Sequence, residues 1–266
     1  MTLPIRLNLV DSSENKSACG SESYAGQLET PPKIDTGKKE EYATGRSFRR
    51  LRFAGQETIE LSGPEPTLAA INRELRRDFD TKKETVQEYF DKRRQFLGQV
   101  GVPAEDENTA DPSYWTSQWL SVRNYTWAAG TGRAGISWFY RTWDLQTGRQ
   151  VDPWTWFGSR KESLNRPGAG PVIATSGGSM TPKLRRFLFR REGIDPAKAE
   201  ENCEFNYKED AYYDLTLEAK GMRFAQPDFG NGCAIEIEVP YAELGPVLTP
   251  AGKAAVRRIL ESAKQP

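Results

Sequence analysis

The side chains that could do chemistry in this 266-residue chain do not include histidine, because the sequence contains none. This excludes Ser-His-Asp and Cys-His nucleophile systems, histidine-based acid–base catalysis and zinc sites with histidine ligands. Any catalysis would have to use carboxylates, tyrosine, lysine or cysteine. The adjacent acids Glu200-Glu201 and Glu209-Asp210 are expected to be solvated, since a glycosidase needs two carboxylates that converge in a cleft.

Two short motifs resemble sites for nucleotides or metals but stand in the wrong context. Residues 130–135 read Gly-Thr-Gly-Arg-Ala-Gly, yet a dinucleotide site requires this glycine-rich turn to open a helix. The strand-forming residues 136–140 follow instead, which favours a hairpin loop. Asp228-Phe-Gly230 matches the metal-binding triplet of kinases, but no catalytic loop and no phosphate-loop lysine accompany it. We therefore expect no nucleotide, metal or other cofactor.

The three cysteines are Cys19, Cys203 and Cys233, and none forms a Cys-x-x-Cys pair. A bond between Cys203 and Cys233 would close a loop of about 30 residues and stabilise the fold by roughly 3–4.7 kcal/mol in the chain-entropy model. Their spacing alone favours a disulfide and two buried thiols about equally. Cys19 lies in a polar stretch with no apolar run before it, which is not typical of a lipidation site.

The charge balance and hydropathy of the chain bear on its partners and compartment. Lysine plus arginine number 37, as do aspartate plus glutamate, so bulk charge favours neither nucleic acid nor an anionic membrane. No stretch approaches the roughly 20 apolar residues of a membrane helix. The apolar run within residues 1–10 is too short for a secretory signal, which leaves a cytosolic protein and a mature exported form both open.

In the first half, the pattern of apolar residues predicts a leader, a hairpin and one helix. Residues 1–45 contain few large apolar residues and are expected to form a flexible leader. Residues 46–61 predict two short strands around Gly55. Apolar residues from Leu68 to Leu97 recur at spacings of three, four or seven, which predicts one long amphipathic helix. Residues 101–113 are expected to form a polar loop.

The second half predicts several strands and two shorter helices. Thr181 and Pro182 are typical of a helix start, and the helix is expected to end near Arg191. Residues 250–264 predict a closing helix. Strands are expected at 119–127, 136–145, 212–218, 222–224 and 235–239, with a strand end at 151–157. The overall fold class is therefore α+β, with an antiparallel sheet packed by one long helix and shorter helices.

All seven tryptophans fall between Trp115 and Trp156. Most are expected in the core, with one or two at a binding edge. The hairpin loop 128–135 is the candidate edge, because loops on a rigid sheet commonly carry binding and because arginine and tryptophan are frequent interface anchors. Its alternative interpretation is a mobile hairpin tip. The candidate binding residues are Trp127, Gly130, Gly132, Arg133 and Trp138.

The order of several motifs resembles the DUF3298 family. The segment WLSVRNYTWAAGTGRAGISWFYRTWDLQTGRQVDPWTWF is similar to that family's strand, small-residue loop and strand ending in a "TG" turn. The later YYDLTLEAKGMRFAQPDFGNGCAIEIEVPYAELGPVL resembles the family's ending, and TIELSGPEPTLAAINREL resembles its partner domain, DUF4163. The resemblance covers residues 46–250. It divides the chain into a DUF4163-like part at 46–110 and a DUF3298-like part at 111–266, joined as one compact unit.

The resemblance implies an extracytoplasmic α+β domain, periplasmic or secreted, that is not itself an enzyme. Proteins with this pair of domains resemble the ectodomain of a lysozyme-sensing anti-sigma factor, the accessory domain of a deacetylase and a secreted mycobacterial antigen. The resemblance also favours the Cys203–Cys233 disulfide. The family's loop usually carries a histidine, whereas residues 132–135 read Gly-Arg-Ala-Gly, so a property that depends on that histidine does not carry over.

The expected function is a non-catalytic binding or sensing module of the cell envelope. Its expected partner is a protein, such as a lysozyme-like cell-wall hydrolase, or a wall glycan. Two alternatives stay open: an inhibitor or immunity protein against such an enzyme, and a carboxylate-dependent enzyme that acts on wall polysaccharide. The oligomeric state is left open.

Overall fold

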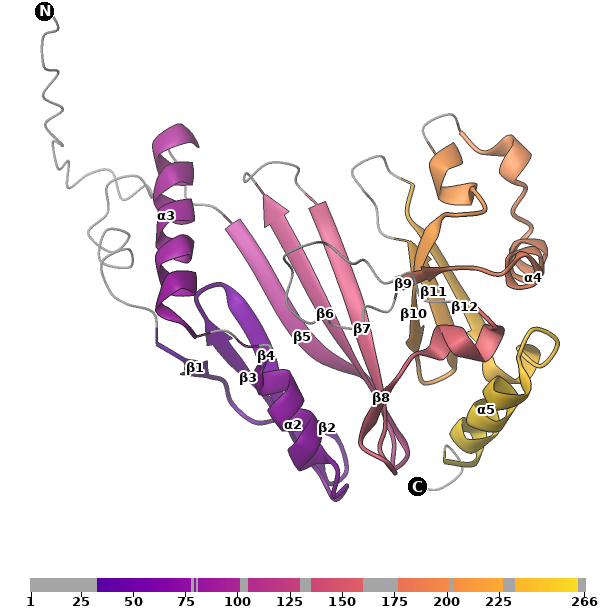
Figure 1. Ribbon diagram of the computed structural model, residues 1–266, viewed down its shortest axis with the longest axis horizontal. Coiled ribbons are helices and arrows are strands. Elements are labelled where there is room, and N and C mark those ends of the chain that lie inside the picture. The colour runs from indigo at the N-terminus through magenta and orange to yellow at the C-terminus, as the bar shows by residue number, and fades with distance from the viewer. Residues whose placement is uncertain are drawn as a thin grey trace, which may run out of the picture.

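The computed structural model describes residues 33–77, 79, 81–100, 105–129, 135–159, 177–200, 203–226 and 233–262. The strands of these residues form three antiparallel sheets of four strands each, which we call the N-terminal, central and C-terminal sheets. Figure 1 shows the three sheets side by side, with helices next to the two outer ones. The predicted α+β class is confirmed, but three sheets take the place of the single sheet.

The N-terminal sheet is built around a hairpin of β3 (Arg46–Phe53) and β4 (Gln56–Ser62). The turn residues Ala54 and Gly55 have φ angles of 48° and 76°. Positive φ at both turn positions is the geometry of a type I′ turn, whose twist matches that of paired strands. The predicted strands around Gly55 are thereby confirmed.

Two short strands, β1 (Asp35–Thr36) and β2 (Glu40–Ala43), pair with the other edge of β3. The prediction of a flexible leader up to residue 45 is therefore wrong for these strands. The segment has few large apolar residues, but the open backbone groups of β3 provide hydrogen-bond partners that the sequence of the segment does not reveal.

The single helix predicted for residues 68–97 is wrong, because α2 (Leu68–Arg77) ends and α3 (Lys83–Val100) begins separately. Between them, Phe79 is buried and belongs to a small apolar cluster with Leu51 and Phe53. The apolar residues of α2 are buried as expected.

The central sheet is an antiparallel meander of β5 (Glu105–Trp115), β6 (Trp119–Ala129), β7 (Gly135–Asp144) and β8 (Arg149–Val151). The expected strands at 119–127 and 136–145 are confirmed. The polar loop expected at 101–113 is wrong from residue 105 onward, because β5 pairs with β6 along its whole length. The ladder irregularity next to Pro112 fits a residue that has no N–H to donate.

The C-terminal sheet has the strand order β12-β11-β10-β9. Its strands are β9 (Gly177–Ser179), β10 (Tyr212–Leu217), β11 (Gly221–Gln226) and β12 (Ile235–Pro240). These confirm the strands predicted from residue 212 onward. The expected strand end at 151–157 is instead the end of β8 followed by the 3₁₀ helix η1 (Pro153–Phe157).

Two helices lie beside the C-terminal sheet (Figure 1). Helix α4 (Pro182–Glu192) begins after Thr181, whose side chain accepts a hydrogen bond from the backbone N–H of Leu184. Helix α5 (Pro250–Ser262) closes the fold. Both predicted helices are confirmed. None of the described helices combines the length and apolar character that crossing a membrane would require.

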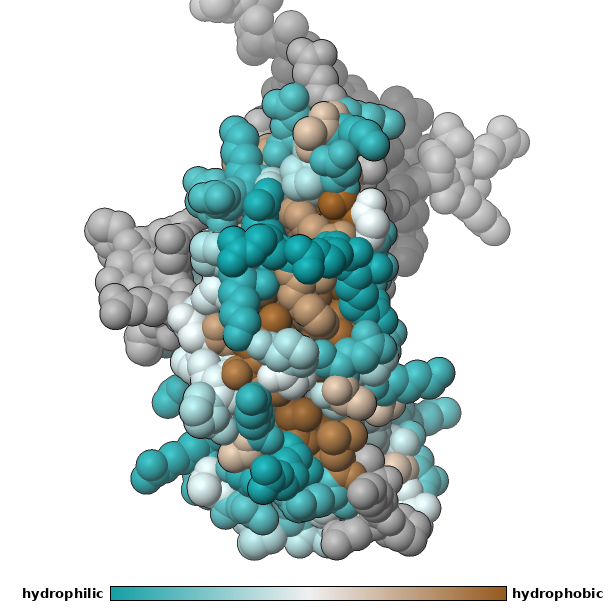
Figure 2. Space-filling view, turned by 90° about the vertical axis from the view of Figure 1, so that its right-hand side faces the viewer, coloured by the Kyte–Doolittle hydropathy of each residue, from teal (hydrophilic) through white to brown (hydrophobic). Residues whose placement is uncertain are grey.

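Two apolar clusters hold the three sheets together. The larger lies between the C-terminal sheet and α4, α5 and η1, and the other joins α2 and β4 to the central sheet. Five of the tryptophans are buried in them, which confirms the core interpretation for these five: Trp115, Trp119, Trp143, Trp154 and Trp156. In Figure 2, which shows the side of the molecule with α4 and α5, apolar residues are visible mainly between hydrophilic side chains.

The predicted disulfide between Cys203 and Cys233 is confirmed, with 5.4 Å between the two Cα atoms. It joins the residue before the 3₁₀ helix η3 (Glu204–Tyr207) to the segment that leads into β12. The side chain of Asn206 in η3 also donates a hydrogen bond to the backbone oxygen of Cys233. The disulfide therefore lies in a buried part of the fold, at one end of the C-terminal sheet.

Candidate functional site

The binding edge expected from the sequence lies mostly beyond the described residues. Gly130, Gly132 and Arg133 fall outside them. Trp127 lies in β6 opposite Ile136, and Trp138 lies in β7 opposite Tyr125. This register places positions 127 and 138 on the same face of the central sheet, and the Trp138 side chain is half-buried. The role of these five residues stays a prediction.

The same face of the central sheet carries a layer of polar side chains where it meets the C-terminal sheet. Ser121 and Thr142 are opposite each other, and their hydroxyl oxygens are 2.8 Å apart. Both side chains are buried, as are Asp214 and Thr216 on β10. The Thr216 hydroxyl lies 3.4 Å from that of Ser113 on β5. Two sheets thus meet through polar groups, where apolar side chains would be the usual filling.

This polar layer continues into a groove of about 620 Å³ between the two sheets. One wall comes from β5 and β6, and the other comes from β11, β12 and the turn between β10 and β11. The lining residues are Asp111, Ser113, Arg123, Glu218, Ala219, Lys220, Arg223, Glu236 and Glu238. The groove is therefore lined almost entirely by polar and charged side chains.

The strand register explains why charges gather on this side of the C-terminal sheet. Thr216 pairs with Arg223, and Arg223 pairs with Glu238, so these three residues form one row across three strands. Side chains alternate between the two faces of a strand. Ile237 and Val239, which flank Glu238, accordingly point into the apolar core. The alternation of apolar and acidic residues in IEIEV therefore places two glutamates in the groove.

Arg223 connects most of the polar groups in the groove. Its Nη2 donates a hydrogen bond of 2.6 Å to the hydroxyl of Tyr140 and lies 3.2 Å from Oε1 of Glu218. Its Nη1 lies 3.8 Å from Oε2 of Glu236. Burial raises the pKa of Tyr140 to about 12, although the charges of Arg223 and Arg123 act in the opposite direction. Tyr140 is therefore a neutral hydroxyl at physiological pH.

Glu218 is a carboxylate of the groove whose pKa is shifted by its surroundings. Burial raises the pKa of Glu218 above its ordinary value, the charge of Arg223 lowers it in part, and the nearby Glu238 raises it again. Glu238 is exposed, and none of the described residues forms an ion pair with it. The two glutamates therefore repel each other in their charged forms.

Asp111 lies on the wall formed by β5 and β6, and its hydrogen bonds help to join the N-terminal and central sheets. It accepts hydrogen bonds from Arg50 on β3 and, at 3.4 Å, from Arg123. Arg50 in turn donates to Glu57 at 2.9 Å, and Glu57 accepts from the backbone N–H of Ala110 at 2.7 Å. This network joins the N-terminal sheet to β5. The acids that remain for a ligand are Glu218, Glu236 and Glu238.

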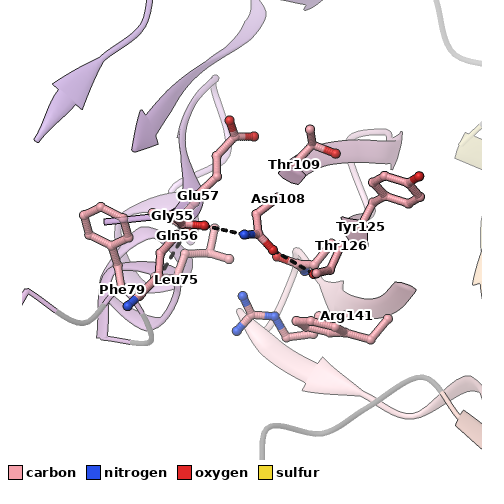
Figure 3. Close-up of a pocket in the computed structure, with 13 residues that line it drawn as sticks. Gly55, Gln56, Glu57, Leu75, Phe79, Asn108, Thr109, Tyr125, Thr126 and Arg141 are labelled. Carbon is pink, nitrogen blue, oxygen red and sulfur yellow. Dashed lines mark hydrogen bonds between the residues drawn. The ribbon is translucent and has the colours of Figure 1, made fainter. Parts of the chain in front are cut away.

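A second cavity of about 190 Å³ lies between the N-terminal and central sheets (Figure 3). The side-chain amide of Asn108 donates to the backbone oxygen of Gly55 and accepts from the Thr126 hydroxyl at 2.9 Å. The side chain of Arg141 points into this cavity (Figure 3) and stacks at 5.3 Å on the ring of Trp143. This cavity is much smaller than the groove, and the hydrogen bond from Asn108 to Gly55 joins the two sheets across it.

Within the described residues, no cluster of three or more histidine, cysteine, aspartate or glutamate side chains is placed to hold a metal ion. A scan against models of known protein families finds no match, and no curated protein matches either. Two similar solved structures are DUF3298 family proteins. The one from Bacteroides fragilis NCTC 9343 is 9% identical over 86% of this chain and 97% of that chain, with a TM-score of 0.47.

The other similar structure comes from Pseudomonas aeruginosa PAO1. It is 13% identical over 85% of this chain and 98% of that chain, with a TM-score of 0.42. Both likenesses are distant. The resemblance of residues 46–110 to DUF4163, and to the particular proteins that carry this pair of domains, stays a prediction.

The groove contains none of the residues that sequence reasoning singled out as a site. Its side chains come from five separate strands or turns between residues 111 and 238. The only local sequence feature of the groove is the pair of glutamates in IEIEV, and by itself this pair indicates the solvated face of a strand. Only the packing of β10 against the central sheet brings these acids near Arg123 and Tyr140.

Proposed function

We propose that this chain is a non-catalytic binding module that works outside the cytoplasm and takes its ligand in the groove between the central and C-terminal sheets. The observation that carries the proposal is the buried polar layer that opens into this groove. Burying hydroxyl and charged groups costs free energy that an apolar interface would avoid, so their placement at an open groove favours a role in recognition. The proposed ligand is a protein, such as a cell-wall hydrolase, or a wall glycan.

The disulfide supports the proposed location. Structural disulfides form and persist in oxidising compartments and are rare in the cytosol. Cys203 and Cys233 are within bonding geometry and the bond lies next to buried groups. A periplasmic or secreted domain is the setting in which such a bond would be retained.

The contacts within the groove favour binding over catalysis. Arg223 is fixed by Tyr140, Glu218 and Glu236, and Asp111 is fixed by two arginines. Tyr140 remains protonated at neutral pH because burial raises the pKa of its hydroxyl. Such a network presents pre-oriented hydrogen-bonding groups to a ligand, which lowers the entropy lost on binding. An inhibitor or immunity protein would use the groove in the same way.

One observation favours a second candidate, an enzyme that acts on wall polysaccharide through carboxylates. The pKa of Glu218 is raised by burial and by its neighbour Glu238, and two acids in unlike environments are the usual basis for acid–base catalysis. In that case Glu218 would be the proton donor. The two functions differ in whether a glycan substrate is cleaved.

A paired binding and cleavage experiment separates the two functions. Purified lysozyme is titrated into the protein in a calorimeter, insoluble peptidoglycan is used in a co-sedimentation assay, and released reducing ends are measured. We expect binding of one probe without release of reducing ends, and weaker binding by Glu236→Gln. The control is Glu60→Gln, which removes the same charge from an exposed side chain on the N-terminal sheet.

The outcomes decide between the candidates. Release of reducing ends that Glu218→Gln abolishes would establish the enzyme and overturn the binding module. Binding that Glu60→Gln weakens as much as Glu236→Gln would remove the groove from the interface. If neither probe binds the folded protein, the proposed partner classes are wrong.

A further inference from the structure

We propose that the groove recognises a basic, extended segment of a protein partner, which pairs with the open edge of β12 and places a lysine or arginine side chain beside Glu238. This inference rests on the proposed function and names the kind of partner. It depends on three features of the described residues: an unpaired strand edge, the side chains that this edge presents, and the charge of the groove.

The first feature is the edge of β12. This strand pairs with β11 over its whole length, from Ile235 opposite Gln226 to Pro240 opposite Gly221, and it is the last strand in the order of its sheet. Within the described ranges, no strand pairs with its other side. Alternate backbone N–H and C=O groups of such an edge point outward and can bind an added strand. Several peptide-binding domains use an edge in this way.

The second feature is the pattern of side chains along β12. Glu236 and Glu238 lie on the groove side, whereas Ile235, Ile237 and Val239 are buried on the other side. Residues that are directly opposite on paired strands share a face, and opposite charges in such pairs stabilise the pairing. An added strand with basic residues at every second position would therefore place them against the two glutamates.

The third feature is the charge of the groove. Its lining holds four carboxylates, Asp111, Glu218, Glu236 and Glu238, and three cations, Arg123, Lys220 and Arg223. Asp111 is also bound by Arg50 from outside the groove. The Arg223 guanidinium lies opposite Glu238 in the register, but its ion pairs are with Glu218 and Glu236.

Glu238 is thus the carboxylate of the groove that has no ion pair among the described residues, and its charge raises the pKa of Glu218. A cation placed beside Glu238 reduces the repulsion between these two glutamates. The unpaired charge of Glu238 would repel a phosphate or another anion. A lysine or arginine side chain therefore fits the groove better than an anionic ligand, and a neutral glycan would leave the repulsion in place.

The test uses the whole protein and short synthetic peptides with blocked ends. The probe is a fluorescent peptide of alternating lysine and threonine, measured by anisotropy at low ionic strength, where exposed charges are least screened. The comparison peptides contain glutamine or glutamate in place of lysine. A further peptide has the lysine sequence with N-methyl groups on alternate backbone nitrogens, which removes hydrogen bonds to a strand edge.

We expect the lysine peptide to bind about tenfold tighter than the glutamine peptide, and the glutamate peptide not to bind. Glu238→Gln is expected to weaken binding of the lysine peptide by about three- to tenfold. The control Glu60→Gln removes the charge of another exposed glutamate, which lies on the N-terminal sheet and does not line the groove, and should leave the affinity unchanged. N-methylation should abolish binding. Because Glu238 is exposed, its variant is expected to fold, and its melting temperature checks this.

Each contrary result removes a part of the inference. Equal binding of the lysine and glutamine peptides would overturn the role of charge, and equal loss in Glu238→Gln and Glu60→Gln would overturn the site. Undiminished binding of the N-methylated peptide would overturn strand pairing. If lysozyme or peptidoglycan binds at Glu236 but the lysine peptide does not bind, this inference is wrong while the proposed function holds. If none of the three binds, both are wrong.

Discussion

Arg258 on α5 donates two hydrogen bonds to Asp144 at the end of β7, from Nη1 to Oδ2 at 2.9 Å and from Nη2 to Oδ1 at 3.1 Å. The same guanidinium lies 4.8 Å from the ring centre of Trp119, the first residue of β6. Paired hydrogen bonds between arginine and a carboxylate are strong and fix geometry. This contact joins the last helix of the chain to the central sheet.

Asp144 is expected to make folding stability depend on acid pH. Burial by itself raises the pKa of Asp144, but the hydrogen bonds and charge of Arg258, together with hydrogen bonds from the backbone of Gln146 and Thr147, outweigh burial and hold the pKa below its ordinary value. A lowered carboxyl pKa adds stability above the unfolded-state pKa of about 4 and loses it as the pH falls further. We expect Asp144→Asn to cost about 1–3 kcal/mol at neutral pH and less near pH 3.

Urea unfolding at both pH values measures this difference. The control is Glu60→Gln, since its exposed pair with Arg49 should contribute little at either pH. A cost for Asp144→Asn that is the same at both pH values would show that the contact contributes through packing and not through its charge.

The disulfide is expected to be quantitative in protein purified under oxidising conditions. Mass spectrometry of an unreduced digest should contain a peptide that links Cys203 and Cys233. Reduction should destabilise the fold by roughly 3–4.7 kcal/mol in the chain-entropy model, seen as a lower melting temperature. Two alkylatable thiols at positions 203 and 233 would contradict this result and favour a cytosolic protein.

Phe79 is expected to be a core residue although it lies between two helices. Its side chain is 7% exposed and contacts Phe53 in an edge-to-face arrangement with 6.1 Å between the ring centres. Phe79→Ala should therefore cost about 3–5 kcal/mol in the free energy of unfolding. The exposed Glu88 on α3 provides the control, because Glu88→Ala should change stability by less than about 0.5 kcal/mol. A cost below about 1 kcal/mol for Phe79→Ala would place the side chain at the surface.

Local sequence signals predicted the elements whose turn or capping residues lie within or next to the element itself. The hairpin at Gly55 carries its turn residue, and α4 carries Thr181 and Pro182 at its start and Gly193 at its end. Such signals act within a few residues, so they can be read without the fold.

The missed elements depend on distant partners. The sequence of β5 begins with Glu105-Asp106-Glu107-Asn108, which has low strand propensity, and it becomes a strand because β6 supplies a full hydrogen-bond ladder. The break between α2 and α3 follows the burial of Phe79 against β3, which apolar periodicity alone cannot show. The groove joins Arg123 to Arg223, and no local pattern links residues that lie so far apart in the chain.

Glu218 is expected to reduce stability at neutral pH. Burial raises the pKa of Glu218 above its ordinary value of 4.5, so the native state binds a proton more readily than the unfolded chain does. For a carboxyl group with a raised pKa, the free energy of unfolding falls as the pH rises through the window just above that ordinary value. Glu218→Gln removes the charge but keeps an oxygen that can accept a hydrogen bond from Arg223.

Denaturant unfolding should therefore show that Glu218→Gln is as stable as the natural protein or more stable at neutral pH, with the difference shrinking toward pH 4.5. Glu236→Gln is the matched control, because the Glu236 side chain is 55% exposed and its charge is well solvated. A residue that lowers stability is retained when it serves binding or catalysis. If Glu218→Gln instead destabilises the protein at neutral pH by more than about 1 kcal/mol, its ion pair with Arg223 is a structural contact, and the raised pKa no longer marks Glu218 as a functional residue.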